Sequence, residues 1–303
     1  MRTLLPLLAL LAALPARAQT VAVTFDDGPK LQETALLSPA ERNQRLLDQL
    51  AKAKVKAALF VTLHNGADRP DGLALLRAWG EAGHVVGNHT VTHLDLDAEG
   101  TTLAAYEAEI LACDEVIRRV PGYRPWHRFT FLREGNTPEK REGIRAFLAG
   151  HRMRNARVTL DTSDWRLDQK LAEILAKDPR ADLSALKAVY LGHLRQRATA
   201  YRELSRRLLG RDVAQVLLLH HSLLNALFLS DVLAQFRADG WTFVTPEAAY
   251  ADPIYRLEPD RLVPGQSLLV SIARSRGVGR TPELLRLLDD ADAEIAELAK
   301  LGY

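Results

Sequence analysis

The stretch VAVTFDDGP, residues 21–29, is the segment that most directly predicts the fold. Its first five residues are apolar or β-branched and predict a strand over 21–25. Two acidic residues follow, and Gly28-Pro29 then predicts a sharp turn. A helical pattern over 40–54 and a second apolar run over 57–62 come next. Strand, helix and strand in this order predict a βαβ unit with two parallel strands.

The same alternation continues along the chain. Further helical patterns lie at 72–82 and 100–119, and further strands are predicted at 85–86, 126–129, 157–160, 213–219 and 241–244. Repeated βα units predict an α/β protein with a mainly parallel sheet, either doubly wound or closed into a barrel. We expect one catalytic domain over 19–251 and a helical extension over 252–303.

The extension should contain a helix from about Gln266 and another that opens at Pro282, a favourable first-turn residue. Four apolar residues can share one face of the last helix, namely Leu284, Leu288, Ile295 and Leu298. Because this pattern covers too few heptads for a zipper, we expect the face to pack on the barrel.

Composition narrows the classes of function. The chain has 303 residues with 40 Lys+Arg against 38 Asp+Glu, 47% apolar and 26% charged, which are the values of a globular protein. The balance lacks the basic excess of a nucleic-acid-binding protein. A single cysteine, Cys113, excludes an internal disulfide and a cysteine metal cluster. A metal would therefore be held by histidine and carboxylate side chains.

The amino terminus predicts a signal peptide over residues 1–18. Arg2 precedes an apolar run over 4–14, and Ala16-Arg17-Ala18 has the small-residue pattern of a cleavage site. The run is shorter than the roughly 20 residues that span a bilayer, which favours cleavage over an uncleaved anchor. We therefore expect a periplasmic or secreted protein with no stable membrane anchor after cleavage.

Ionisable residues follow or end five of the predicted strands. In parallel α/β folds the carboxyl ends of strands meet at one edge, where active sites assemble. The residues are Asp26 and Asp27 in the first strand's turn, His89 and His93, Arg128, Asp161 and Asp164, and His220.

Two of these groups suit a metal-assisted reaction. His89 and His93 are four residues apart, so on one helical turn both rings would reach a single cation. Asp26 and Asp27 are adjacent and point in different directions, so one can ligate a metal while the other serves as a general base. A His, His, Asp set suits zinc or a similar divalent ion. Taken alone, a histidine pair at this spacing is more typical of surface or capping histidines, and Asp-Asp-Gly-Pro is common in surface turns.

Five motifs in this order resemble the polysaccharide deacetylases that share the NodB homology domain, also called carbohydrate esterase family 4. The motifs are TFDDGP at 24–29, HTVTH at 89–93, RFTF at 128–131, DTSDW at 161–165 and LLLH at 217–220. The resemblance implies a deformed (β/α) barrel of about seven parallel strands. It also implies metal-dependent removal of acyl groups, usually acetyl, from amino sugars.

The resemblance further implies roles for individual residues. Asp27, His89 and His93 would hold the divalent metal, with zinc favoured over cobalt or another ion. Asp26 would be the base and His220 the acid. Arg128 beside Asp26 would keep that carboxylate ionised, and Asp164 beside His220 would favour the charged imidazole. The remaining positions concern substrate binding: a backbone N–H near Phe131 would assist the oxyanion, and the acetyl methyl would be walled by Trp165 and Leu218.

Three departures from the family pattern leave questions open. Thr130 stands where a proline is common, and the segment continues through 132–135. Arg133 and Glu134 in it would be either a subsite or a solvated loop pair, with the loop pair favoured. His221 follows His220 where the family often has Asp, so either histidine is a candidate acid.

The segment 166–212 is a long helical insertion rich in arginine. It would form a lid or grip an anionic glycan, or be a solvated face with internal ion pairs, which we favour. The arginines are Arg195, Arg197, Arg202, Arg206, Arg207 and Arg211.

We therefore expect an exported, metal-dependent hydrolase that removes acetyl groups from an N-acetylated carbohydrate. Two alternatives remain open: an esterase or amidase that uses the same metal site on another substrate, and a non-catalytic saccharide-binding relative. The expected partner is a carbohydrate and not a nucleic acid. The sequence does not specify protein partners or which polymer is bound.

Overall fold

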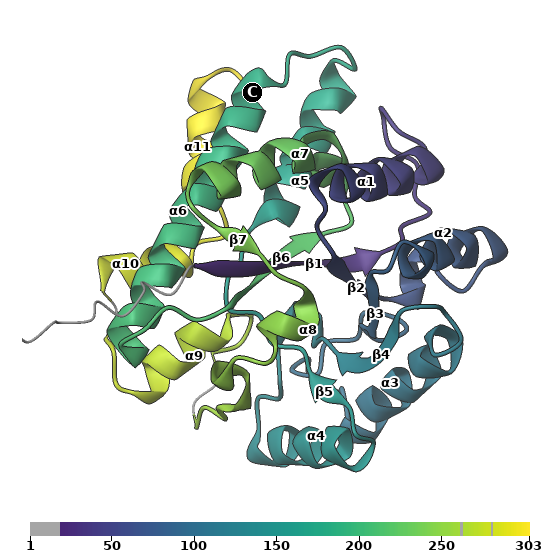
Figure 1. The fold of residues 1–303 in the computed structure, drawn as a ribbon, viewed down its shortest axis with the longest axis vertical. Coiled ribbons are helices and arrows are strands. Elements are labelled where there is room, and N and C mark those ends of the chain that lie inside the picture. The colour runs from purple at the N-terminus through teal and green to yellow at the C-terminus, as the bar shows by residue number, and fades with distance from the viewer. Residues whose placement is uncertain (1–18, 261–262, 280) are drawn as a thin grey trace, which may run out of the picture.

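The computed structural model describes residues 19–260, 263–279 and 281–303, so the predicted signal peptide lies outside the described residues. A parallel sheet of seven strands runs in the order β5-β4-β3-β2-β1-β6, with β7 paired to β1 (Figure 1). The strands are β1 (Thr20–Gly28), β2 (Ala57–Val61), β3 (Val85–Asn88), β4 (Tyr123–His127), β5 (Arg154–Asn155), β6 (Gln215–His220) and β7 (Thr242–Phe243).

The sheet curls into a deformed barrel. The chain just after β5, at one edge of the sheet, reaches the strand at the other edge, because Leu160 forms a parallel bridge with Leu217 of β6. This closure distinguishes the barrel from a doubly wound sheet and confirms the predicted fold class. β1 lies between β2 and β6, and its register places Asp26 directly beside His220.

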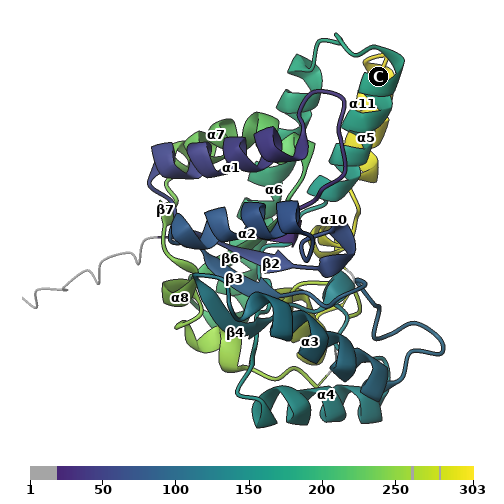
Figure 2. The ribbon, with the colours of Figure 1, turned by 90° about the vertical axis from the view of Figure 1, so that its right-hand side faces the viewer.

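Helices surround the sheet, as Figures 1 and 2 show. They are α1 (Pro39–Ala53), α2 (Pro70–Glu81), α3 (Leu103–Ile117), α4 (Pro138–Gly150), α5 (Asp164–Lys177), α6 (Ser184–Leu209), α7 (Leu223–Ala238), α8 (Pro246–Ala249), α9 (Leu268–Ser275), α10 (Pro282–Leu287) and α11 (Asp292–Lys300). Helix α1 begins with a capping box in which Ser38 and Glu41 bond each other's backbone N–H groups. Among the described residues, no helix is both long and apolar enough to cross a membrane.

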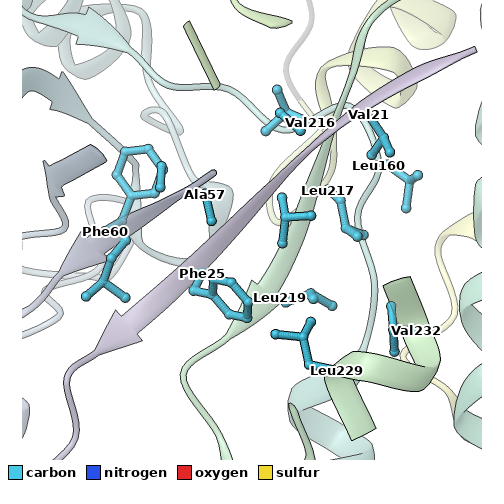
Figure 3. Close-up of a cluster of buried hydrophobic side chains, with 14 of the residues drawn as sticks. Val21, Phe25, Ala57, Phe60, Leu160, Val216, Leu217, Leu219, Leu229 and Val232 are labelled. Carbon is cyan, nitrogen blue, oxygen red and sulfur yellow. The ribbon is translucent and has the colours of Figure 1, made fainter. Parts of the chain in front are cut away.

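The core is centred on β1, whose apolar residues Val21, Ala22, Val23 and Phe25 are fully buried. Strands covered on both faces have continuous apolar runs rather than alternating ones. Figure 3 shows Phe25 among the leucines of β6 and α7. The ring of Phe25 also meets Trp79 of α2 edge-on, with centroids 5.5 Å apart. The strand that carries Asp26 and Asp27 is therefore held rigidly on all sides.

The predicted strand at 157–160 is wrong. The strand of this region is β5, and 157–160 is irregular apart from the bridge at Leu160. Two polar side chains explain the difference. Thr159 Oγ1 accepts a hydrogen bond from the backbone N–H of Val216, in place of a ladder carbonyl. Arg157 forms a two-pronged ion pair with Glu134.

The single last helix predicted from Pro282 is also wrong. Helix α10 ends at Leu287, and α11 begins at Asp292 after Ala291 adopts a left-handed conformation with φ 62°. Arg197 of α6 donates to the carbonyls of Leu287 and Asp289, which would otherwise continue the helical pattern. Leu284 and Leu298 are nevertheless both buried, and helices α9, α10 and α11 contact α6.

The arginines of the predicted insertion mostly form internal ion pairs at the outer surface. Arg202 and Arg206 both bind Asp212, and Arg211 binds Asp252. Arg195 pairs with Asp239. These contacts agree with the solvated-face interpretation of the arginines.

Candidate active site

One cavity of about 550 Å³ lies at the carboxyl ends of the strands. Eight of the predicted site residues line it: Asp26, Asp27, His89, His93, Phe131, Trp165, Leu218 and His220. The other two, Arg128 and Asp164, are buried behind this lining, and each contacts one of its members. Five strand ends and their loops therefore bring together residues that lie up to 194 positions apart, from 26 to 220.

Asp27, His89 and His93 form a compact group whose potential ligand atoms all lie within 4.8 Å of one another. The Nε2 atoms of His89 and His93 are 3.6 Å and 3.3 Å from Asp27 Oδ1. Burial would raise the pKa of Asp27, but His93 and the charge of Lys30 hold that pKa well below its usual range. Burial lowers the pKa of His89 to about 3. The group is thus a carboxylate beside a neutral imidazole, the forms that ligate a metal.

The hydrogen bond made by His89 Nδ1 shows which nitrogen of the ring is unprotonated. His89 Nδ1 lies 2.7 Å from the carbonyl oxygen of Arg128, which can only accept, so Nδ1 carries the proton and donates. Nε2 is therefore unprotonated and faces Asp27. A ring nitrogen that donates to a carbonyl while the other faces the site is the usual arrangement of metal-binding histidines.

The predicted helical turn at 89–93 is wrong, although the two rings do converge. The segment is an irregular loop with left-handed residues at Thr90, φ 70°, and His93, φ 61°. Its backbone is held from outside: Glu109 of α3 accepts from the N–H groups of Val91 and Thr92 at 2.9 Å and 2.7 Å. The loop can therefore leave helical geometry without losing its hydrogen bonds.

Asp26 is paired with Arg128. Arg128 Nη1 donates to both carboxylate oxygens of Asp26, at 3.0 Å and 3.1 Å, and the two side chains are almost fully buried. Burial raises the pKa of Asp26 to about 6, and the charge of Arg128 limits that rise. Asp26 is only 3% exposed, although it lines the cavity. Arg128 is in turn held by Tyr250 and by the ring of Phe60, 4.3 Å from its Cζ.

His220 is paired with Asp164. His220 Nδ1 lies 2.7 Å from Asp164 Oδ1, and the His220 backbone N–H donates to Oδ2 of the same carboxylate. Burial lowers the pKa of His220, but the charge of Asp164 outweighs it and raises the pKa to about 9. His220 Nε2 is left to face the cavity as the charged imidazolium.

His221 does not share this position. It is fully buried on the other side of the strand, where its Nε2 lies 3.0 Å from Asn43 Oδ1. Burial lowers its pKa to about 3. The chain passes so close here that a Cβ on Gly28 would lie 2.8 Å from His221 and 2.7 Å from Leu59. Of the two histidines, only His220 lines the cavity.

The segment 130–135 is tightly anchored. Thr130, at the position where the family commonly has proline, donates from Oγ1 to the carbonyl of Leu94. Phe131 is left-handed, φ 54°, and 49% exposed, with its ring edge-on to His93 at 4.5 Å between centroids. Arg133 binds Asp95, and Glu134 binds Arg157. Both charged residues thus anchor this segment to other parts of the chain.

Several supporting residues were not predicted. Lys30 Nζ lies 3.3 Å from Asp27 Oδ2, and Asn225 of α7 donates to Asp164 at 2.7 Å. The helical extension also contributes, because Gly265 and Asp290 line the cavity. Sequence offered one signal for Lys30, which directly follows the turn motif. It offered none for the others, because their contacts depend on how distant segments pack.

Comparison with known proteins supports the resemblance. Residues 13–139 match the family described as polysaccharide deacetylase. The chain is 32% identical over 111 residues to a peptidoglycan-N-acetylglucosamine deacetylase of Bacillus cereus, covering 37% of this chain and 35% of that protein. It is 33% identical over 125 residues to a chitooligosaccharide deacetylase of Rhizobium leguminosarum bv. trifolii, covering 39% and 53%. The chain thus spans between about a third and about half of the length of these curated relatives.

A solved structure agrees on the fold. The chitin deacetylase from Colletotrichum lindemuthianum superposes with a TM-score of 0.53 at 21% identity, covering 77% of this chain and 88% of that one. At this identity the likeness concerns the fold alone. The sequence matches support the predicted family over part of the chain, and the likeness of fold confirms the deformed barrel.

Proposed function

We propose that this protein, whose residues 13–139 match the polysaccharide deacetylase family, is a metal-dependent hydrolase that removes acetyl groups from an N-acetylated carbohydrate. One observation carries the proposal. Asp27 Oδ1 is buried without a hydrogen-bond partner among the described residues, yet it faces two histidine nitrogens. An orphaned buried acceptor that faces two imidazole rings is destabilising unless a cation occupies the space between them.

Asp27, His89 and His93 would hold a divalent metal, zinc first, with cobalt or another ion as alternatives. When bound, such an ion polarises a carbonyl and lowers the pKa of coordinated water toward neutrality. Two contacts within the protein would keep these ligands in place. His89 is fixed by the Arg128 carbonyl, and Asp27 is fixed by Lys30 through its other oxygen.

Asp26 is the general base of the proposal. With a pKa of about 6 it is mostly ionised at neutral pH and still basic enough to take a proton from the attacking water. Arg128 keeps the carboxylate in place with two hydrogen bonds and cannot itself accept the proton.

His220 is the general acid. An amide nitrogen leaves only after protonation, and an imidazolium with a pKa of about 9 holds that proton at neutral pH. Asp164 fixes the ring through Nδ1, so the proton to be delivered is the one on Nε2. Base and acid come from paired positions on β1 and β6, so they flank one reacting group.

Substrate contacts complete the proposal. Trp165 and Leu218 line the cavity and would enclose the acetyl methyl, and a backbone N–H near Phe131 would donate to the oxyanion. The exposed faces of Phe131 and Trp165, 49% and 38% accessible, offer apolar surfaces for a sugar ring. The two relatives described above are named for peptidoglycan N-acetylglucosamine and for chitooligosaccharide.

Purified protein should release acetate from N-acetylglucosamine oligomers, lose this activity with a chelator, and regain it with zinc or cobalt. Asp26→Asn should be inactive with the metal still bound. Hydrolysis that survives complete metal removal would contradict the proposal. Glycan binding without acetate release from any substrate would support the non-catalytic alternative. The presence of both Asp26 and His220 argues against that alternative. Faster turnover of acetylated xylan or of small non-sugar amides would support the esterase or amidase alternative.

We also propose that residues 1–18 direct export to the periplasm or the medium. Expression of the full chain in a Gram-negative host, followed by mass spectrometry of the periplasmic fraction, should find a protein that begins at Gln19. Recovery of the uncleaved chain in the membrane fraction would instead indicate an anchor.

A further inference from the structure

A buried histidine and a buried glutamate lie outside the proposed mechanism. They are His193 of α6 and Glu294 of α11, and His193 Nδ1 lies 3.0 Å from Glu294 Oε1. The other ring nitrogen, His193 Nε2, accepts from the backbone N–H of Ser163 at 3.2 Å. Ser163 directly precedes Asp164, the partner of His220. The pair therefore connects the helical extension to the backbone next to Asp164.

The hydrogen bond from Ser163 determines which nitrogen of His193 carries the proton. A backbone N–H can only donate, so Nε2 is unprotonated, and the proton of the neutral ring lies on Nδ1 and is donated to Glu294. This hydrogen bond lowers the pKa of Glu294, so the acceptor is a carboxylate at neutral pH. Without an acceptor at Nδ1, the neutral ring can place its proton on Nε2, where it would meet the Ser163 N–H as a second donor. Glu294 thus sets the tautomer that Ser163 requires.

The segment that leads into α5 is also held by two other contacts. Thr162 Oγ1 donates to the Leu218 carbonyl of β6 at 2.8 Å, and Ser163 Oγ donates to the Asp289 carbonyl at 3.4 Å. Asp289 lies in the turn between α10 and α11, and its neighbour Asp290 lines the active-site cavity. The extension therefore reaches the active site through this turn and contacts the same segment twice, once by the turn and once by way of Glu294.

The position of this segment matters because Asp164 makes three contacts at once. Its Oδ1 lies 2.7 Å from His220 Nδ1, and its Oδ2 accepts from the His220 backbone N–H at 2.8 Å and from Asn225 at 2.7 Å. Asp164 is the first residue of α5, so a shift of the Ser163 backbone moves the base of its side chain. A misplacement of about 1 Å in a catalytic group can cost about 10²-fold in rate.

From these contacts we infer that Glu294 and His193 are positioning residues for the proposed acid, because they hold the backbone that orients Asp164 toward His220. The inference rests on the proposed function, in which His220 delivers the proton. It gives the extension, which lies beyond residues 13–139 that match the family, a part in aligning the active site. Helix α11 packs on α6 (Figure 1), and an apolar pair would serve that packing equally well, so packing alone does not require these polar groups.

The test compares two substitutions of similar size at Glu294. Glu294→Met leaves no acceptor for His193 Nδ1, so kcat for N-acetylglucosamine oligomers should fall about tenfold. KM should change less than about twofold, because the proton is delivered only in the transition state. Glu294→Gln keeps an acceptor oxygen and should retain most of the wild-type kcat. Glu297→Met, at an exposed position on α11, is the matched control and should change nothing.

A spectroscopic measurement separates this inference from the proposed function. The proton on His220 Nδ1, in its short hydrogen bond to Asp164, should give a downfield NMR resonance, identified as the one that His220→Gln removes. In Glu294→Met this resonance should move upfield or broaden, and in Glu294→Gln it should stay in place, even if the protein releases no acetate from any substrate.

An unchanged resonance in Glu294→Met would overturn the inference, and so would an equal loss of kcat in Glu294→Met and Glu294→Gln. Should Glu294→Met fail to fold, Glu294→Asp carries the test, because it withdraws the carboxylate from His193 Nδ1 by one methylene group. A wild-type resonance in Glu294→Asp would then refute the inference, and a resonance shifted upfield would support it.

Discussion

The candidate active site contains two buried histidines in opposite protonation states. His89, on the side of the proposed metal ligands, is neutral, and His220, on the side of the proposed acid, is charged. On the metal side, burial drives the pKa of His89 down to about 3, and its Nδ1 donates to a neutral carbonyl. On the acid side, burial acts in the same direction on His220, yet the Asp164 carboxylate on Nδ1 raises the pKa to about 9. The partner of the second nitrogen therefore decides whether a buried histidine is suited to be a ligand or an acid.

Removing a metal ligand should have the largest effect on activity. His89→Ala removes one ligand and leaves Asp27 facing a single imidazole, so we expect loss of bound zinc and about a 10³-fold or greater fall in kcat/KM. Metal content by mass spectrometry and acetate release measure both effects. His151→Ala, at an exposed position at the end of α4, is the control and should retain full metal. A His89→Ala protein with stoichiometric metal would show that the group is not the binding site.

Removing the carboxylate that pairs with His220 should lower kcat by about 10²-fold, a smaller effect, because the metal ligands remain. In Asp164→Asn the neutral amide no longer raises the pKa of His220 above its ordinary value. The imidazolium is then lost at lower pH, so the descending limb of the pH–rate profile should move toward acid relative to wild type. An unchanged limb would mean that His220 is not the group whose deprotonation ends activity. Asp178→Asn, exposed at the end of α5, is the matched control.

A gentler change tests whether Lys30 belongs to the metal side. Lys30 Nζ contacts Asp27 Oδ2, while Oδ1 faces the histidines, so the lysine holds the carboxylate with one oxygen toward the cation. Lys30→Met should weaken zinc binding about tenfold, as for other residues that orient a ligand. Competition with a chromogenic chelator measures the affinity. Lys52→Met, on the exposed face of α1, should leave it unchanged.

Sequence predicted the parts of this site that depend on local pattern. The buried strand before Asp26 and the order of the five motifs both follow from short stretches, and they place every proposed residue at the right end of the sheet. The conformation of 89–93 was missed, because it depends on Glu109, which lies 16 residues beyond His93 and caps the loop from another helix.

Long-range contacts explain the other errors as well. The predicted strand at 157–160 lost its regular geometry to Glu134, and the last helix was interrupted by Arg197, nearly a hundred residues upstream. Periodicity reports only which residues are apolar, so a buried arginine that captures carbonyl oxygens leaves no mark in the pattern. For the same reason, the contribution of Gly265 and Asp290 to the cavity could not be predicted from the sequence pattern.

The smallest effect should come from the histidine that is adjacent to the acid but lies outside the cavity. His221 donates from Nε2 to Asn43 in the core, and Asn43 Oδ1 already accepts from Trp79. His221→Gln should therefore cost about 1–2 kcal/mol of unfolding free energy through a weakened buried hydrogen bond. It should change kcat less than threefold, whereas His220→Gln should lose at least 10²-fold in kcat. Urea denaturation and acetate release, measured on both variants, distinguish the two positions. If His221→Gln were the inactive one, the acid would be the buried histidine, and the contrast between the two halves of the site would fail.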